Sequence, residues 1–206
     1  MIRKSFVLLA LLALGAAPVR AQGLEFSGGV NMAKLSGAAV ADAARGLGMN
    51  IGLDLVIPVG PIGINIGGDF AQLSSDRTVG SEAQVVDLSY IQLPLHVRLP
   101  LVGAGPLRLN VVLGPTLGIN TGCEITTDLD GVRDCGDVGL GGIDARSLDW
   151  SGTGGLGLSF RLGGLAYAGV DLLGTFGFTE VENTAIQDGL KNTAFRLQGH
   201  FGFDVF

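Results

Sequence analysis

Hydrophobic and polar residues alternate along most of the chain from residue 24 onward. In residues 195–206, FRLQGHFGFDVF, the odd-numbered positions are mostly large and apolar, whereas the even-numbered positions include Arg196, Gln198, His200 and Asp204. Such a period of two is typical of a β-strand with one apolar and one polar face. Seven earlier segments share the pattern: 24–33, 47–57, 62–70, 91–99, 107–119, 156–162 and 165–176. The pattern therefore predicts eight strands.

The joints between these strands alternate in length. Three joints are short and rich in Pro and Gly, which is the chemistry of tight turns: 58–61, 100–106 and 163–164. The other joints are long: 36–46, 72–84, 120–149 and 178–191. Short turns at one rim and long loops at the other are typical of outer-membrane barrels. We therefore predict an all-β fold, an eight-stranded antiparallel up-and-down transmembrane β-barrel.

Composition supports a membrane location for the apolar face. The chain is 47% hydrophobic and contains 35 glycines, yet after the N-terminal segment it has no uninterrupted apolar run long enough for a spanning helix. A closed barrel is the other structure that satisfies its backbone in lipid. A soluble lipocalin-like barrel would also alternate, with its apolar face turned inward. The polar set is too thin and glycine-rich to cover the outside of such a barrel, so we favour lipid.

The N-terminal segment predicts export. Residues 1–21 have a basic start, an apolar run too short to cross a bilayer, and small residues before a cut after Ala21. We expect a cleaved signal peptide at 1–21 and a single barrel domain at 22–206, in the outer membrane of a Gram-negative bacterium. Cleavage changes the formal charge from −6 to −9, because Arg3, Lys4 and Arg20 lie in this segment and no acid does. Such an acidic chain is a poor ligand for nucleic acid.

Charged residues on the polar faces predict an ion-paired interior, because arginine facing lipid at mid-depth would cost about 2–4 kcal/mol. We expect one group near the short turns, with Glu25 as a further member, and a second group higher up that holds Asp69, Asp171 and Arg196. With eight strands the lumen is just wide enough to be filled by side chains. The alternative is a water-filled vestibule with individually solvated charges. The interior polar cluster is Asp54, Asp69, Arg98, Arg108, Arg161, Asp171, Arg196 and Asp204.

Aromatic residues predict the membrane interfaces. We expect Tyr90 and Trp150 near the loop-side interface, and Phe160, Tyr167, Phe203 and Phe206 near the other. The C-terminal aromatics Phe201, Phe203 and Phe206 are expected to form the signal that the barrel-assembly machinery recognises before the last strand closes on the first.

Four stretches in the second half of the chain resemble the PorT-type outer-membrane β-barrel family. They are LSYIQLPLHVRLP, NVVLGPTLGI, LDWSGTGGLGLSF and KNTAFRLQGHFGFDVF, within residues 86–206. The resemblance implies an eight-stranded outer-membrane barrel, a role in secretion or surface interaction for a few members, and no specific activity for most. The third residue from the end is apolar or aromatic in such barrels, whereas here it is Asp204.

Cys123 and Cys135 are the only cysteines of the chain and lie in the longest predicted loop. In an exported chain they are expected to form a disulfide that stabilises the loop by about 2–3 kcal/mol. Asp128, Asp130 and Asp134 between them echo calcium-loop spacing. The remaining ligands of that motif are missing, including its closing Glu, so a solvated acidic loop is favoured over a metal site.

No catalytic motif or cofactor fingerprint occurs in the sequence. Some small outer-membrane barrels are lipid A-modifying enzymes that use His and Ser, but His96 and His200 lie on polar faces and are expected to form interior hydrogen bonds. We therefore favour a non-enzymatic monomeric barrel, bound by outer-membrane lipid, that presents its loops to an extracellular or cell-envelope protein. The alternatives are a channel for a small or hydrophobic solute and, as a lesser one, an outer-leaflet lipid enzyme.

Overall fold

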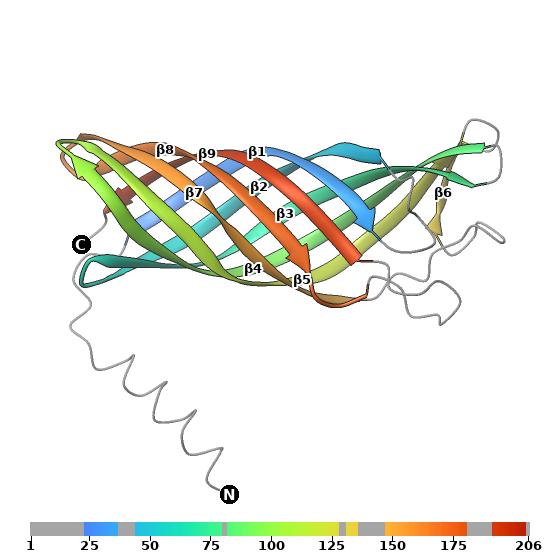
Figure 1. Ribbon diagram of the computed structural model, residues 1–206, viewed down its shortest axis with the longest axis horizontal. Coiled ribbons are helices and arrows are strands. Elements are labelled where there is room, and N and C mark those ends of the chain that lie inside the picture. Colours follow the sequence, from blue (N-terminus) through green and yellow to red (C-terminus); the bar gives the residue numbers. More distant parts are fainter. Residues whose placement is uncertain are drawn as a thin grey trace, which may run out of the picture.

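A computed structural model describes residues 23–36, 44–79, 82–127, 131–135, 147–180 and 191–204. The predicted signal peptide at 1–21 and the predicted terminal signal residue Phe206 lie outside these ranges. The described part contains nine strands (Figure 1): β1 Gly23–Ser36, β2 Ala44–Val59, β3 Ile62–Val79, β4 Glu82–Ala104, β5 Leu107–Thr127, β6 Gly131–Asp134, β7 Leu148–Gly163, β8 Ala166–Gly177 and β9 Lys191–Asp204. Within the same ranges, no helix has the length and apolar content needed to cross a membrane.

Eight of these strands form a closed antiparallel barrel. The strand order is β4-β3-β2-β1-β9-β8-β7-β5, and the pairing of β4 with β5 closes the ring. The first and last barrel strands pair continuously from Gly23 opposite Asp204 to Ser36 opposite Lys191. The fold prediction is confirmed. The short strand β6 was not predicted, and it pairs only with the outer part of β5.

The two ends of the barrel differ in their connections (Figure 1). At the end that we call the turn end, on the left of the figure, tight turns join β2 to β3, β4 to β5 and β7 to β8. Gly60, Gly105 and Gly164 lie in these turns with φ angles of 62°, 59° and 56°, a conformation that only glycine adopts readily. The short joints are therefore where the sequence predicts them. The opposite end is called the loop end.

The loop end contains more strand than the sequence predicts. Residues 72–84 were expected to be a long loop, but β3 continues to Val79 and β4 begins at Glu82. Residues 120–127 likewise extend β5. The prediction of these two loops is wrong because strand pairing continues past the apolar belt, where polar side chains such as Ser74 and Asp87 still lie opposite each other. A transmembrane strand needs only about 9–11 residues, so β3, β4 and β5 project beyond the membrane.

The wall has an apolar outside and a polar inside. Leu53 and Leu95 are exposed on the outer surface by 45% and 46%, whereas Asp54, next to Leu53, is 7% exposed and faces the lumen. The lipocalin-like alternative requires the reverse arrangement and is excluded. An apolar band around a closed barrel is matched by lipid rather than by water. The protein is therefore an integral barrel of the outer-membrane type.

The aromatic interface prediction is correct only in part. Trp150, Phe160 and Phe203 lie exposed on the outer face. Tyr90, expected at the loop-side interface, is 1% exposed and faces the lumen. Tyr167 also lines the inside, where its ring lies 6.2 Å from that of His200. Both tyrosines occupy inward positions of their strands, and this strand parity outweighs the general preference of tyrosine for membrane interfaces.

An apolar cluster fills the lumen near the loop end. We call this cluster the interior cap; it brings together buried side chains from five strands around Tyr90. Cys123 packs against it from β5. Because the cluster lies inside the barrel, it gives the projecting strands a small hydrophobic core of their own. The cap consists of Ala33, Leu35, Leu73, Val86, Leu88, Tyr90, Ile125, Cys135 and Ala194.

Candidate functional site

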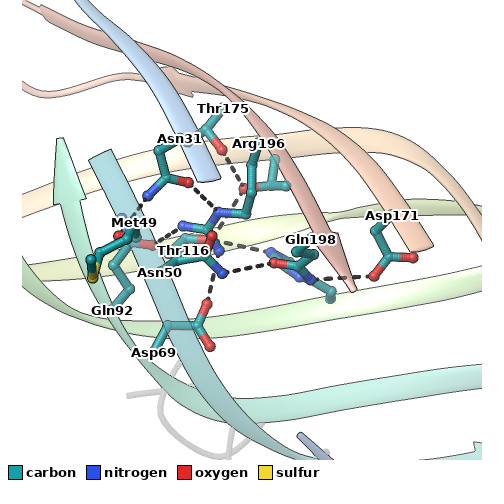
Figure 2. A network of polar contacts seen from close by, with 12 residues as sticks. Asn31, Met49, Asn50, Asp69, Gln92, Thr116, Asp171, Thr175, Arg196 and Gln198 are labelled. Carbon is teal, nitrogen blue, oxygen red and sulfur yellow. Dashed lines mark hydrogen bonds and ion pairs between the residues drawn. The ribbon is translucent and has the colours of Figure 1, made fainter. Parts of the chain in front are cut away.

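Arg196 on β9 joins four strands through side-chain contacts in the middle of the lumen (Figure 2). Its Nε donates to Asn31 Oδ1 at 3.0 Å, its Nη1 to Asp69 Oδ2 at 2.9 Å and its Nη2 to Gln92 Oε1 at 2.6 Å. Asn31 in turn donates to the carbonyls of Met49 and Gln72, at 3.1 Å each. Each of the three guanidinium nitrogens thus donates to an oxygen of β1, β3 or β4, which fixes Arg196 across the lumen.

Arg98 on β4 forms a second group of contacts nearer the turn end. Its Nη2 lies 2.7 Å from Glu25 Oε1 on β1 and 3.0 Å from Asp171 Oδ2 on β8. Glu25 and Asp171 are fully buried, and the Arg98 side chain is 13% exposed. β1 and β8 are not neighbours of β4 in the barrel, so the guanidinium crosses the lumen to reach them.

Gln198 links the Arg98 group to β2. Its Nε2 donates to Asp171 Oδ2 at 3.2 Å, and its Oε1 accepts from Asn50 Nδ2 at 3.2 Å (Figure 2). His200 Nδ1 also lies 3.2 Å from Asp171 Oδ2. We call the residues of these contacts around Arg98, Arg196 and Gln198 together the central network. Because its contacts reach from β1 to β9 and across to β4, side chains occupy the middle of the lumen.

The structure groups the predicted interior charges differently from the sequence analysis. Asp69 lies with Arg196 as expected, but Asp171 pairs with Arg98 and belongs to the group nearer the turn end. The sequence prediction placed Asp171 too high because alternation indicates the inward face of a residue but not its depth. Asp54 lies directly opposite Glu25 in the register of β1 and β2. It is buried in the same part of the lumen.

The remaining predicted charges lie around a cavity at the turn end. This cavity has a volume of about 510 Å³ and is lined by residues of all eight barrel strands, with Glu25, Arg98 and Tyr167 among its more buried members. Arg161 pairs with Asp204 at 3.2 Å, and both are partly exposed. Arg108 also lines the cavity but is exposed, and no ion pair joins it to the central network within the described residues. For Arg108 the prediction of an ion-paired interior position is wrong, because it lies at the solvated mouth.

Several members of the central network are uncharged and were missed as site residues. Asn31 and Gln92 accept hydrogen bonds from Arg196, and Gln198 donates one to Asp171, but none of the three was predicted as a site residue. Their positions on the inward-facing side of the strands could have indicated this role, because an amide side chain buried in a narrow barrel needs hydrogen-bond donors and acceptors around it. His96 fits its prediction: its Nε2 lies 3.1 Å from Thr116 Oγ1 inside the barrel.

The predicted disulfide is present at the loop end. Cys123 on β5 and Cys135, which follows β6, are joined with a Cα–Cα distance of 5.4 Å. The bond attaches the β6 segment to the interior cap, to which Cys135 belongs. Asp134 is exposed on β6, while Asp128 and Asp130 lie outside the described residues. At the other end of the chain, Phe201 and Phe203 lie exposed on the outer face of β9 with their rings in edge contact.

One set of buried residues has the composition of a metal site. The ligand atoms of Glu25, Asp171 and His200 lie within 4.8 Å of one another. Arg98 Nη2 already contacts both carboxylates of this set, so a guanidinium occupies the place of a cation. These contacts join β1, β4 and β8 from inside the barrel.

Comparisons with known proteins find likenesses only at low sequence identity. No protein-family model matches the sequence, and no curated protein matches it. Among solved structures, the chain is similar to the Neisserial surface protein NspA, with 10% identity, 89% of this chain and 96% of that chain covered, and a TM-score of 0.49. It is also similar to Ail of Yersinia pestis, crystallised with a heparin analogue, with 14% identity, 89% and 99% coverage, and a TM-score of 0.45. A third match is the outer membrane protease OmpT of Escherichia coli, with 10% identity, 90% and 97% coverage, and a TM-score of 0.44. These likenesses concern the fold and include an enzyme, so they do not distinguish between functions.

Proposed function

We propose that the protein is a non-enzymatic outer-membrane barrel that displays its loop end to an extracellular or cell-envelope protein, with a closed lumen. The observation that carries this proposal is the filling of the lumen in two layers. The central network crosses the middle of the barrel through Arg98 and Arg196, and the interior cap lies above it around Tyr90. An ion crossing this barrel would have to displace both layers.

The loop end has the features of a display surface. The strands that project there contain the interior cap as a core, and the disulfide ties β6 to it. Surfaces held rigid in this way lose less conformational entropy when they bind a partner. Closure of the barrel leaves no unpaired edge along the membrane, which favours a monomer.

A lipid-modifying enzyme finds less support in this geometry. Such an enzyme needs its acid–base residue at the lipid-facing surface, where the substrate lies. His96 and His200 both point into the lumen, and His200 is buried beside Asp171. The cavity at the turn end favours solute passage, but it ends among the buried residues Glu25 and Arg98. Passage would therefore require the central network to open.

Single-channel recording in planar lipid bilayers tests the closed lumen. We expect the purified protein to insert without stepwise currents. An Arg98→Ala, Arg196→Ala double variant, which removes both guanidinium groups that cross the lumen, is the matched comparison and should show more frequent openings. Stepwise currents from the unmodified protein at ordinary voltages would favour the channel instead. Mass spectrometry of lipid A from cells with and without the gene tests the enzyme, and we expect identical lipid A in both.

A further inference from the structure

The middle of the lumen contains more acidic than basic side chains. Among the described residues there, Glu25 and Asp171 share the guanidinium of Arg98, and Asp69 contacts that of Arg196. Asp54 has no hydrogen-bond or ion-pair partner within the described part of the chain, although it is 7% exposed. Four carboxylates thus face two guanidinium groups. Arg98 and Arg196 attract Asp54 electrostatically, but neither pairs with it, and a buried carboxylate without a direct partner is unfavourable unless it takes up a proton or binds a cation.

Three buried oxygen atoms near Asp54 also lack hydrogen-bond partners. They are Asp54 Oδ1, Asp69 Oδ1 and Ser27 Oγ. Asp69 and Ser27 are 5% and 6% exposed, so all three side chains are at least nine-tenths buried. Asp69 uses its other oxygen for Arg196, which leaves Oδ1 available. The neutral Ser27 hydroxyl is an observation independent of the acidic residues, because its oxygen is an acceptor without a donor in the same place.

The register brings these oxygens to one part of the wall. Ser27, Gly52 and Asp69 lie side by side across β1, β2 and β3, and Asp54 lies opposite Gly67 in the adjacent row. A Cβ atom at Gly52 would collide with Asp69 Oδ1 and come within 2.8 Å of Ser27 Oγ, and one at Gly67 would collide with Asp54 Oδ1. Each aspartate therefore leans over a glycine of the other's strand, and the two glycines keep this space open.

We propose that Asp54, Asp69 and Ser27 bind a calcium ion inside the barrel. All of the offered atoms are oxygens, which favours a hard cation over zinc. Ca²⁺ accepts irregular sets of six to eight oxygens completed by water, whereas Mg²⁺ demands a near-ideal octahedron. Two positive charges also balance the two carboxylates that exceed the guanidinium groups. The set of Glu25, Asp171 and His200 does not compete, because Arg98 already occupies it.

The cavity at the turn end provides an entry path. Its lining includes Glu25 and Val56. Glu25 lies opposite Asp54 in the register, and Val56 is the next residue of β2 that shares its face. A hydrated cation that enters between the short turns therefore reaches Glu25, the register partner of Asp54, at the inner end of the cavity.

Calorimetric titration with CaCl₂ tests the site, using the purified full barrel in detergent after treatment with a chelator. We expect one Ca²⁺ per chain. When Ca²⁺ is present at about a hundred times its Kd, the midpoint of thermal unfolding should rise by about 5–10 °C. Mg²⁺ and Na⁺ at the same ionic strength should give little or none of this shift. Absence of a calcium effect, or an equal effect of Na⁺, would overturn the proposal.

Two variants and one control separate binding from folding. Asp54→Asn should abolish the calcium effect, yet in chelator it should be at least as stable as the parent, because it removes an uncompensated charge. Ser27→Ala should weaken calcium binding by about tenfold without any change of charge. Asp204→Asn, at the rim and paired with Arg161, is the control and should keep the parent's affinity. Unchanged calcium affinity in both Asp54→Asn and Ser27→Ala would show that water and protons satisfy these oxygens instead.

Discussion

Arg98 on β4 holds Asp171 on β8 across the lumen through two contacts. Nη2 lies 3.0 Å from Oδ2, and Nη1 lies 3.4 Å from Oδ1. Since Arg98 also reaches Glu25 on β1, one side chain links three strands that are not neighbours in the ring. The barrel is therefore held by contacts through its interior as well as by the hydrogen bonds of its wall.

Replacement of Arg98 should destabilise the barrel strongly. Arg98→Ala leaves two buried carboxylates without their cationic partner, so we expect the free energy of unfolding to fall by about 3–5 kcal/mol. Urea unfolding in phospholipid vesicles measures the loss. Arg108→Ala removes an exposed arginine of the same cavity and should change stability by less than about 0.5 kcal/mol. Similar losses in the two variants would contradict a structural role for the contacts across the lumen.

Adjacent glycines of β3 should respond oppositely to the same substitution. A Cβ at Gly67 would collide with Leu53 O and Asp54 Oδ1, so Gly67→Ala should lower stability by about 1–3 kcal/mol. At Gly68 a Cβ would meet no atom within 4 Å, so Gly68→Ala should be neutral or slightly stabilising. The two midpoints of unfolding, compared in one lipid, check the expectation. A tolerated Gly67→Ala would show that Asp54 can move without cost.

Charge placed on the outer face should be tolerated only beyond the membrane. Leu95→Arg puts a guanidinium into the apolar belt and should lower the free energy of unfolding by about 2–4 kcal/mol, the cost of an arginine that faces lipid at mid-depth. Val132→Arg adds the same group on β6, at the loop end, where Val132 is exposed, and should cost under about 0.5 kcal/mol. Folding yields in vesicles report both. Equal yields would argue against lipid around Leu95.

Reduction of the disulfide should loosen the loop end and leave the barrel intact. Cys123 and Cys135 are separated by 12 positions, and the chain-entropy model assigns about 2–3 kcal/mol to the closure of so short a loop. We expect faster hydrogen exchange in residues 123–135 after reduction, or in a Cys123→Ser, Cys135→Ser variant. Exchange in β1 and β9 should not change, and a faster rate there would show that the bond supports the whole barrel.

Alternation along the strands was sufficient to predict the architecture. The inward parity of Arg98, Asp171 and Arg196 followed from their neighbours, because a shift of one residue would turn every apolar side chain to the wrong face. The turns followed from Pro and Gly chemistry. Strand ends at the loop end could not be located, because polar residues such as Ser74 are compatible both with a loop and with a strand outside the membrane.

Pairing inside the lumen was beyond the reach of the sequence pattern. Whether Asp171 meets Arg98 or Arg196 depends on the stagger between strands far apart in the ring, and alternation carries no information on stagger. Tyr90 was misplaced for a different reason, since the preference of tyrosine for interfaces was weighed without the inward-facing position of this residue on its strand. The gap over Gly52 likewise became visible only when β1, β2 and β3 were in register.

The seam between β1 and β9 makes completion of the barrel a late event. Its fourteen residue pairs join the two most distant barrel strands of the chain, so no early part of the polypeptide can form them. Contacts of such long sequence separation are slow to form. Until residues 191–204 have been synthesised and have paired, the backbone amide and carbonyl groups on the β9-facing edge of β1 have no partner strand. A chaperone that shields this strand during transit would protect the nascent protein from pairing with the wrong neighbour.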